Sequence, residues 1–97
     1  MDFGLRDKVA LVAASSQGLG LAVAEEFAAE GAKLILCARG EDALRKASDT
    51  IAASAGVETL AVTGDLTSGD EVERIVNSGI DRFGHIDILV TNAGGPP

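Results

Sequence analysis

Apolar residues along the chain fall into four short, continuous runs separated by longer segments of mixed polarity. The runs cover residues 9–13, 33–38, 58–62 and 86–90. An uninterrupted apolar run of this length, bounded by polar residues, is typical of a strand that is covered on both faces. The pattern therefore predicts four buried strands, and we expect the third run to lie nearer an edge of their sheet.

The segments between the runs repeat their apolar residues every three to four positions, which is the spacing of an amphipathic helix. The predicted helices span residues 18–30, 41–54 and 69–83, and a glycine suited to a helix C-terminus closely follows each one. Gly79 falls inside the third helix and weakens it slightly. The side chains expected to face the sheet are Leu19, Val23 and Phe27, then Leu44, Ala47, Ser48 and Ile51, and finally Val72, Ile75, Val76 and Ile80.

Strands and helices thus alternate in the order βαβαβαβ. Helices of this length between strands imply parallel strands joined by right-handed crossovers. The predicted fold is therefore α/β, half of a three-layer, doubly wound Rossmann-type sheet with the strand order 3-2-1-4. We expect residues 1–97 to form one domain. The fourth strand would remain an apolar edge, which another chain or further sequence would cover.

Composition narrows the classes of partner. The net charge is −7 at pH 7, whereas surfaces that bind nucleic acid or anionic membranes need clustered lysine and arginine. No apolar stretch reaches the roughly 18 residues of a membrane-spanning helix, and residues 1–8 do not resemble a signal peptide. Cys37 is the single cysteine and leaves no internal disulfide, which favours a reducing, cytoplasmic location.

A glycine-rich turn, Ser-Ser-Gln-Gly-Leu-Gly at residues 15–20, lies between the first strand and the first helix. Glycines at such a turn let the backbone approach a pyrophosphate, which the N–H groups and the dipole at the helix start can bind. The two serines add hydroxyl donors. A structural turn without a ligand is the alternative, but the position between a buried strand and an amphipathic helix favours phosphate binding.

The end of the second strand carries the next indication. Dinucleotide-binding folds place a ribose-binding acid there, roughly 20 residues after the glycines. This chain has Ala38 and Arg39 instead, and an arginine can pair with the 2′-phosphate that NADP carries and NAD lacks. Glu41 and Asp42 follow in the first turn of a helix, where the helix dipole alone accounts for carboxylates. We therefore expect NADP rather than NAD, with a surface arginine at the sheet edge as the alternative.

Three motifs in order make the chain resemble the short-chain dehydrogenase/reductase family over its whole length. The family's Thr-Gly-x-x-x-Gly-x-Gly motif aligns with residues 13–20, its adenine-contacting Asp with Asp65, and its Asn-Asn-Ala-Gly motif with residues 91–94. The resemblance implies that cofactor contacts come from Ala14, Ser16, Gln17, Gly18, Leu19, Arg39, Asp65, Leu66, Asn92, Ala93 and Gly94.

Several positions depart from the family motifs. Ala13 and Ala14 replace the Thr and the first Gly of the first motif, and the Cβ of Ala14 requires a negative φ at the tight turn. Thr91 replaces the first Asn of the later motif. Gln17 stands where NADP-using relatives often carry Arg or Lys, which leaves Arg39 as the main basis for expecting NADP.

The resemblance implies an oxidoreductase that moves a hydride between nicotinamide and a small carbonyl or alcohol substrate, as a homo-oligomer when intact. The family's Ser-Tyr-Lys catalytic set follows the Asn-Ala-Gly segment, and this chain contains no tyrosine. We therefore expect residues 1–97 to be the cofactor-binding part, truncated before the catalytic segment and without a catalytic residue. The alternative is an inactive NAD(P)-binding or sensing domain. A methyltransferase-type fold is disfavoured because Ala38 replaces its strand-end acid.

Two further side chains with reactive groups are expected to be structural. His85 begins a strand without a second ligand at metal-binding spacing, so we expect it to face solvent and predict no metal site. Cys37 lies inside a buried strand, where an inert core thiol is expected.

Overall fold

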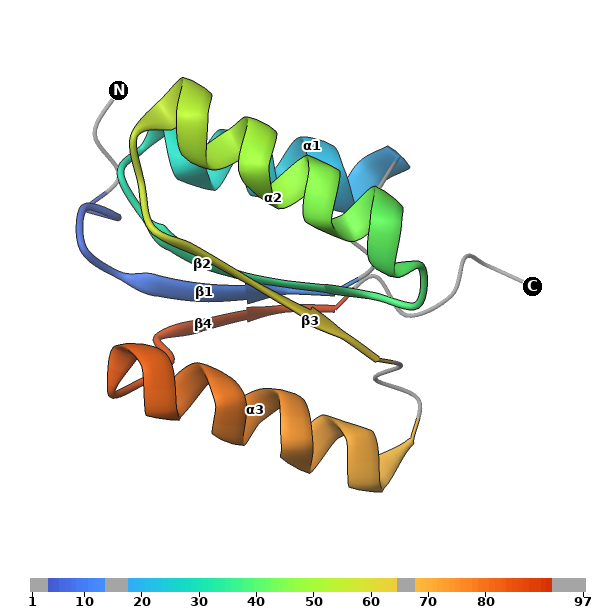
Figure 1. Cartoon of the computed structure of the whole chain (residues 1–97). Coiled ribbons are helices and arrows are strands. Elements are labelled where there is room, and N and C mark those ends of the chain that lie inside the picture. Colours follow the sequence, from blue (N-terminus) through green and yellow to red (C-terminus); the bar gives the residue numbers. More distant parts are fainter. Residues whose placement is uncertain (1–3, 14–17, 65–67, 92–97) are drawn as a thin grey trace.

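The computed structural model describes residues 4–13, 18–64 and 68–91. Within these ranges the chain forms strands and helices in the predicted alternating order (Figure 1). The elements are β1 (Val9–Val12), α1 (Gly18–Ala29), β2 (Lys33–Ala38), α2 (Glu41–Ala55), β3 (Thr59–Thr63), α3 (Gly69–Phe83) and β4 (Ile88–Val90). Their ends differ from the predicted ones by small shifts, the largest at the start of β4, where the ladder begins at Ile88 rather than at residue 86.

The strands form one parallel sheet in the order β3-β2-β1-β4, which confirms the predicted order. β1 lies between β2 and β4, and its last residue, Val12, is level with Leu36 of β2 and Val90 of β4. On the far side of β2, Ala38 pairs with Thr63 of β3. β3 is therefore an edge strand, as expected from the third apolar run, and β4 is the other edge.

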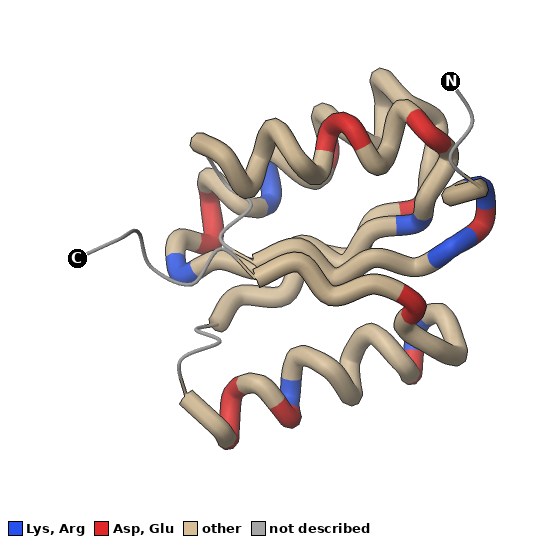
Figure 2. Tube along the Cα trace, turned by 180° about the vertical axis from the view of Figure 1, so that it is seen from behind, with Lys and Arg blue, Asp and Glu red and all other residues tan. Residues whose placement is uncertain are grey.

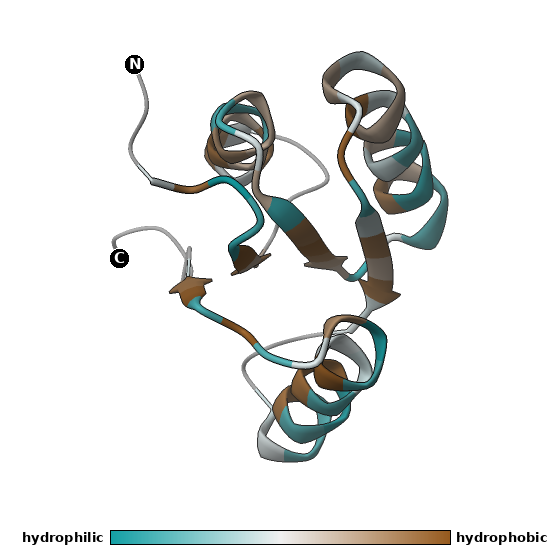
Figure 3. Ribbon diagram, turned by 90° about the vertical axis from the view of Figure 1, so that its left-hand side faces the viewer, coloured by the Kyte–Doolittle hydropathy of each residue, from teal (hydrophilic) through white to brown (hydrophobic). Residues whose placement is uncertain are grey.

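Helices cover both faces of the sheet: α1 and α2 lie on one face and α3 on the other (Figure 1). Successive side chains of a strand point to opposite faces, so the strands contribute to two apolar clusters. Strand residues beneath α1 and α2 are Ala10, Val12, Leu34, Leu36 and Ala38, and those beneath α3 are Val9, Leu11, Ile35, Cys37 and Val62. Figure 3 shows the hydrophobic strands between the helices. Burial on both faces explains why the apolar runs are continuous.

α1 packs on the sheet through a different face from the predicted one. Its buried residues are Gly20, Ala24 and Ala28, whereas Leu19 is 67% exposed. Val23 and Phe27 are only partly buried and pack against the side of the same cluster. The prediction was wrong by one position along the helix, because small residues allow the helix backbone to lie closer to the strands than leucine or phenylalanine would.

α3 also approaches the sheet through a glycine. Ile75 and Gly79 are buried, whereas Ile80, which was predicted to face the sheet, is 41% exposed. A Cβ on Gly79 would stand 2.3 Å from Cδ1 of Ile35, a buried side chain of β2. Gly79 is therefore required for packing, although its low helix propensity makes it look like a weak point in the sequence.

α2 buries the predicted face, which includes one polar side chain. Ser48 is 5% exposed, and its Oγ lies 2.8 Å from Oγ1 of Thr59 in β3. One hydroxyl of this pair donates to the other, so the polar atoms are satisfied inside the core.

Charged residues of the described chain lie on the helices and near the strand ends, and the middle of the sheet carries none (Figure 2). None of the helices in the described part of the chain is long and apolar enough to cross a membrane.

Candidate functional site

The carboxyl ends of all four strands lie at the same end of the sheet, which we call its carboxyl edge as distinct from the edge strands β3 and β4. The helices that follow β1, β2 and β3 begin there (Figure 1). Two hydrogen bonds continue the pairing beyond the strands. The Ala13 N–H donates to the Val90 carbonyl at 2.9 Å, and the Gly64 N–H donates to the Ala38 carbonyl at 2.9 Å. The segments that follow the strands therefore leave the sheet from neighbouring points. Every residue predicted to contact the cofactor belongs to one of these segments.

Part of the predicted site lies within the described residues. Gly18 and Leu19 open α1, and Arg39 follows β2. The positions Ala14, Ser16, Gln17, Asp65, Leu66, Asn92, Ala93 and Gly94 lie outside the described residues. Their described neighbours in the sequence, Ala13, Gly64 and Thr91, all follow strand ends at this edge.

Gly18 has a backbone conformation that suits a closely approaching ligand. Its φ of +65° lies in the left-handed region, and a Cβ built on it would meet no described heavy atom within 4 Å. The neighbouring Leu19 is 67% exposed. Among the described residues, none occupies the space beside the first turn of α1 into which a side chain at position 18 would project. This arrangement fits the pyrophosphate of a dinucleotide, which requires close approach to backbone N–H groups.

The start of α1 differs electrostatically from the starts of the other two helices. α2 carries Glu41 and Asp42 in its first turn, and α3 carries Asp70 and Glu71, whereas the first turn of α1 contains no acidic residue. Carboxylates in a first turn interact favourably with the positive end of the helix dipole. Since α1 supplies no such carboxylate, its N-terminal turn fits an anion that comes from a ligand.

Arg39 is exposed directly after β2, at the same edge of the sheet. Gly40 continues the chain in an extended conformation, with φ −86° and ψ 112°, and α2 begins at Glu41. The Glu41 carboxylate is engaged within α2, where its Oε2 lies 3.2 Å from Nη2 of Arg45. Glu41 therefore forms an ion pair along its own helix, whereas Arg39 is the basic residue that directly follows β2.

Arg74 reaches this edge without belonging to any of the sequence motifs. Its Nη2 donates to the carbonyl of Thr63, the last residue of β3, and lies 3.4 Å from Oε1 of Glu71. The spacing of Glu71 and Arg74, three residues apart on a helix, indicates an ion pair from sequence alone. The contact with a strand carbonyl depends on how α3 packs and could not be found in the same way.

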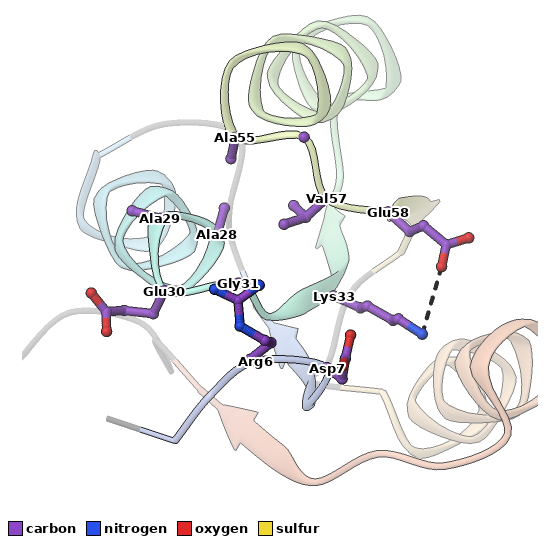
Figure 4. A pocket seen from close by; sticks show the side chains of 11 residues that line it. Arg6, Asp7, Ala28, Ala29, Glu30, Gly31, Lys33, Ala55, Val57 and Glu58 are labelled. Carbon is purple, nitrogen blue, oxygen red and sulfur yellow. Dashed lines mark ion pairs between the residues drawn. The ribbon is translucent and has the colours of Figure 1, made fainter. Parts of the chain in front are cut away.

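A hollow of about 670 Å³ lies at the opposite, amino edge of the sheet (Figure 4). It is bordered by the ends of α1 and α2 and by the start of β2, and it contains side chains of both signs. These are Arg6 and Lys33 together with Asp7, Glu30 and Glu58. Lys33 is already paired with Glu58, at 3.6 Å. The helix ends that border the hollow present carbonyl groups rather than N–H groups, so the hollow does not suit a pyrophosphate.

Two carboxylates near the amino edge have lowered pKa values. The pKa of Glu58 lies below its usual range because Arg82 donates a hydrogen bond to it and attracts it electrostatically, which outweighs the opposing effect of burial; Lys33 adds a smaller lowering effect. The pKa of Asp87 is lowered chiefly by the backbone N–H of Val9, which donates to its Oδ2 at 2.9 Å, and less by the charges of His85 and Lys8. Both groups support the fold at the edge opposite the predicted site.

The other side chains with reactive groups have structural positions. His85 Nε2 lies 2.9 Å from Oδ2 of Asp87, and its side chain is 56% exposed, which confirms that it faces solvent. Cys37 is 1% exposed, as expected for a core thiol, and its Sγ lies 3.8 Å from the Val12 carbonyl. Among the described residues, no group of three His, Cys, Asp or Glu side chains could hold a metal ion.

Comparison with known proteins agrees with the observed fold. The family model for short chain dehydrogenase matches residues 8–97. The 1,6-dihydroxycyclohexa-2,4-diene-1-carboxylate dehydrogenase of Pseudomonas putida is 38% identical over 95 residues, which cover 98% of this chain and 34% of that protein.

Solved structures show the same likeness. The L-sorbose reductase of Gluconobacter frateurii, solved in complex with NADPH and L-sorbose, has a TM-score of 0.95 and 43% identity, over 100% of this chain and 37% of that one. A short chain dehydrogenase/reductase of Burkholderia phymatum, solved with NAD, has a TM-score of 0.84 and 34% identity, over 90% of this chain and 31% of that one.

The chain spans about a third of the length of these relatives. The match of the family model covers nearly all of the residues. The chain therefore belongs to the short chain dehydrogenase family.

Proposed function

We propose that residues 1–97 are the cofactor-binding part of a nicotinamide-dependent oxidoreductase that acts on a small carbonyl or alcohol substrate. The observation that carries this proposal is the opening of α1: a left-handed Gly18 beside open space, followed by a first turn without carboxylates. Family membership supports the proposal. The nicotinamide ring, when bound, would supply the hydride chemistry.

The chain's own residues would hold and orient this cofactor. Gly18 and Leu19, with Ala14, Ser16 and Gln17, would contact the pyrophosphate side, where backbone N–H groups at the helix start can donate. Asp65 and Leu66 after β3, and Asn92, Ala93 and Gly94 after β4, would line the neighbouring part of the site. These assignments rest on the family motifs and on the shared edge from which the segments leave the sheet.

We infer that the preferred cofactor is NADP. Arg39 is a basic residue at the end of β2, and Glu41, the nearest carboxylate that follows it, is engaged with Arg45 inside α2. A guanidinium at this position can form charge-assisted hydrogen bonds with a 2′-phosphate. The likeness to an NADPH-bound reductase supports this choice, and the likeness to an NAD-bound member makes NAD the competing cofactor.

The catalytic groups of the intact enzyme would come from outside these residues. The family resemblance implies a tyrosine as the acid that transfers a proton to the carbonyl, and residues 1–97 contain no tyrosine. We further propose that residues 1–97 form a single nucleotide-binding domain. We also propose that the intact enzyme works in the cytoplasm and is a homo-oligomer.

Calorimetric titration of the protein with NADPH and with NADH tests the proposal. We expect NADPH to bind with at least about tenfold higher affinity, equivalent to one charge-assisted interaction with the 2′-phosphate. Equal affinities would contradict the assignment of NADP. Absence of binding by either nucleotide to folded protein would contradict the cofactor-binding function itself.

A further inference from the structure

Two arginines attach α3 to β3, one at each end of the strand. Arg74 lies near the start of α3, and its Nη2 donates to the carbonyl of Thr63 at the carboxyl end of β3. Arg82 lies near the end of α3, and its Nη2 donates to Oε1 of Glu58 at 2.9 Å, directly before the amino end of β3. The first contact is to a backbone carbonyl and the second is to a carboxylate, and only the first lies at the edge where the cofactor-binding segments leave the sheet.

Gly64 allows the Arg74 side chain to lie against the chain at this point. A Cβ on Gly64 would stand 2.6 Å from Nη2 of Arg74 and 2.8 Å from Cδ1 of Ile75. Glu71 lies beside the guanidinium, with its Oε1 3.4 Å from the same nitrogen. Arg74 is therefore held over the residue that follows β3 by a neighbouring carboxylate, and any side chain at position 64 would collide with it.

The backbone at the end of β3 is fixed on both of its sides. Toward β2, the Gly64 N–H donates to the Ala38 carbonyl at 2.9 Å. β3 is an edge strand, whose outward carbonyls have no neighbouring strand to pair with. Arg74 supplies a donor to one such carbonyl, that of Thr63. The next residue after Gly64 in the sequence is Asp65, where the family motif places its adenine contact.

We propose that Arg74 is a positioning residue for the adenine side of the nucleotide site. By binding the Thr63 carbonyl, it holds the backbone of Thr63 and Gly64, the residues that directly precede Asp65 in the sequence, and it thereby raises nucleotide affinity without touching the nucleotide. The inference rests on the proposed cofactor-binding function. It assigns a role in that function to a residue of α3 that lies outside the glycine, Asp and Asn-Ala-Gly motifs.

The test compares Arg74→Ala with Arg82→Ala, a matched control that removes an arginine from the other end of the same helix. Binding of NADPH and of adenosine 5′-monophosphate is measured by calorimetry, and stability by thermal unfolding. We expect Arg74→Ala to weaken both nucleotides by a similar factor, about five- to tenfold, which is the effect of part of one charge-assisted hydrogen bond. Arg82→Ala should lower the unfolding temperature and leave both affinities unchanged.

Two further variants test the positioning role, and thermal unfolding of each measures the accompanying loss of stability, since a Cβ on Gly64 also meets the buried Ile75. Arg74→Lys keeps a cationic donor that can reach a carbonyl, so it should recover part of the affinity. Gly64→Ala keeps Arg74 but displaces it, so it should weaken nucleotide binding as Arg74→Ala does. Equal nucleotide affinities in the parent, Arg74→Ala and Gly64→Ala would overturn the inference while leaving the proposed function intact. If the parent protein binds neither nucleotide, the proposed function fails instead.

Discussion

Asp87 and Val9 exchange two hydrogen bonds at the amino edge of the sheet. The Val9 N–H donates to the Asp87 carboxylate at 2.9 Å, and the Asp87 N–H donates to the Val9 carbonyl at 2.9 Å. This pair joins β1 to the chain that enters β4, ahead of the first ladder position, Ile88. The Asp87 carboxylate thus accepts the hydrogen bond that a backbone carbonyl would accept within a strand ladder. It fixes the register of β4, which is only 3 residues long.

The Asp87 carboxylate should make stability depend on pH in the acidic range. Its pKa in the folded protein is lowered, chiefly by the Val9 N–H, so the unfolded state binds a proton more readily. The stabilising contribution is therefore fully present above the ordinary aspartate pKa of about 3.9, and it is lost as the pH falls through the lower folded value. Asp87→Asn should be less stable than the parent at neutral pH, and the difference should narrow below about pH 4.

Urea unfolding of both proteins at a series of pH values measures this difference. Asp49→Asn is a suitable control, because it removes an exposed carboxylate from the helix α2 without touching β1 or β4. A gap between parent and Asp87→Asn that stays constant from neutral pH down to about pH 3 would contradict the assigned linkage.

Gly79→Ala should destabilise the protein although alanine is the better helix former. The new Cβ would stand 2.3 Å from Cδ1 of the buried Ile35, and overpacking of a core costs about 1–3 kcal/mol, more than the gain of roughly 1 kcal/mol in helix propensity. Ile35→Val removes the colliding atom. In the Ile35→Val background, Gly79→Ala should therefore cost less, and a double-mutant cycle of unfolding free energies should show this coupling. Additive effects of the two substitutions would exclude the contact as the cause.

The element positions could be predicted because burial on both faces produces a strong signal, and the strand order followed from the doubly wound topology that the alternation of strands and helices implies. Residues 33–38 are apolar almost throughout, and β2 occupies the same range with Lys33 only partly buried at its start. The start of the first helix at Gly18 was predicted correctly for a related reason, since it follows a strand and opens a helix whose patterns are both unambiguous. The positions of these elements depend mainly on the local sequence.

Helix orientation could not be predicted as well, because hydrophobic spacing does not indicate how closely a helix approaches the sheet. Leu19 fits the apolar spacing of α1 but is exposed, and Gly20 is buried in its place. Gly79 behaves in the same way in α3. The role of Arg74 was also hidden, because its carbonyl partner, Thr63, is 11 residues away and is reached only once α3 has packed. Close packing through small residues depends on the surfaces of both the helix and the sheet, so the helix sequence alone does not reveal it.

Gly18→Ala tests whether the open space at α1 belongs to a ligand. Gly56 provides a matched control, since it has a similar left-handed φ of +68°, has no described atom within 4 Å of a built Cβ, and lies at the far end of α2. Each substitution forces a side chain into the left-handed region and should cost about 1–2 kcal/mol of stability. Only Gly18→Ala should also reduce NADPH affinity, by about tenfold or more, because its methyl group enters the pyrophosphate space. Calorimetry measures NADPH binding by both variants. If Gly18→Ala and Gly56→Ala bind NADPH with the same affinity, a ligand at Gly18 is excluded.

Arg39→Asp should reverse the cofactor preference of the protein. The substitution replaces a partner of the 2′-phosphate with a like charge that repels it, and a carboxylate at the end of β2 can instead accept hydrogen bonds from the ribose hydroxyls of NAD. We expect the ratio of NADPH to NADH affinity to fall by about a hundredfold, the equivalent of nearly 3 kcal/mol. Arg45→Asp changes the net charge by the same amount on the exposed face of α2, where Arg45 pairs with Glu41, and it should alter the ratio far less. If the two variants shift the ratio equally, the selectivity comes from the overall charge of this region rather than from Arg39.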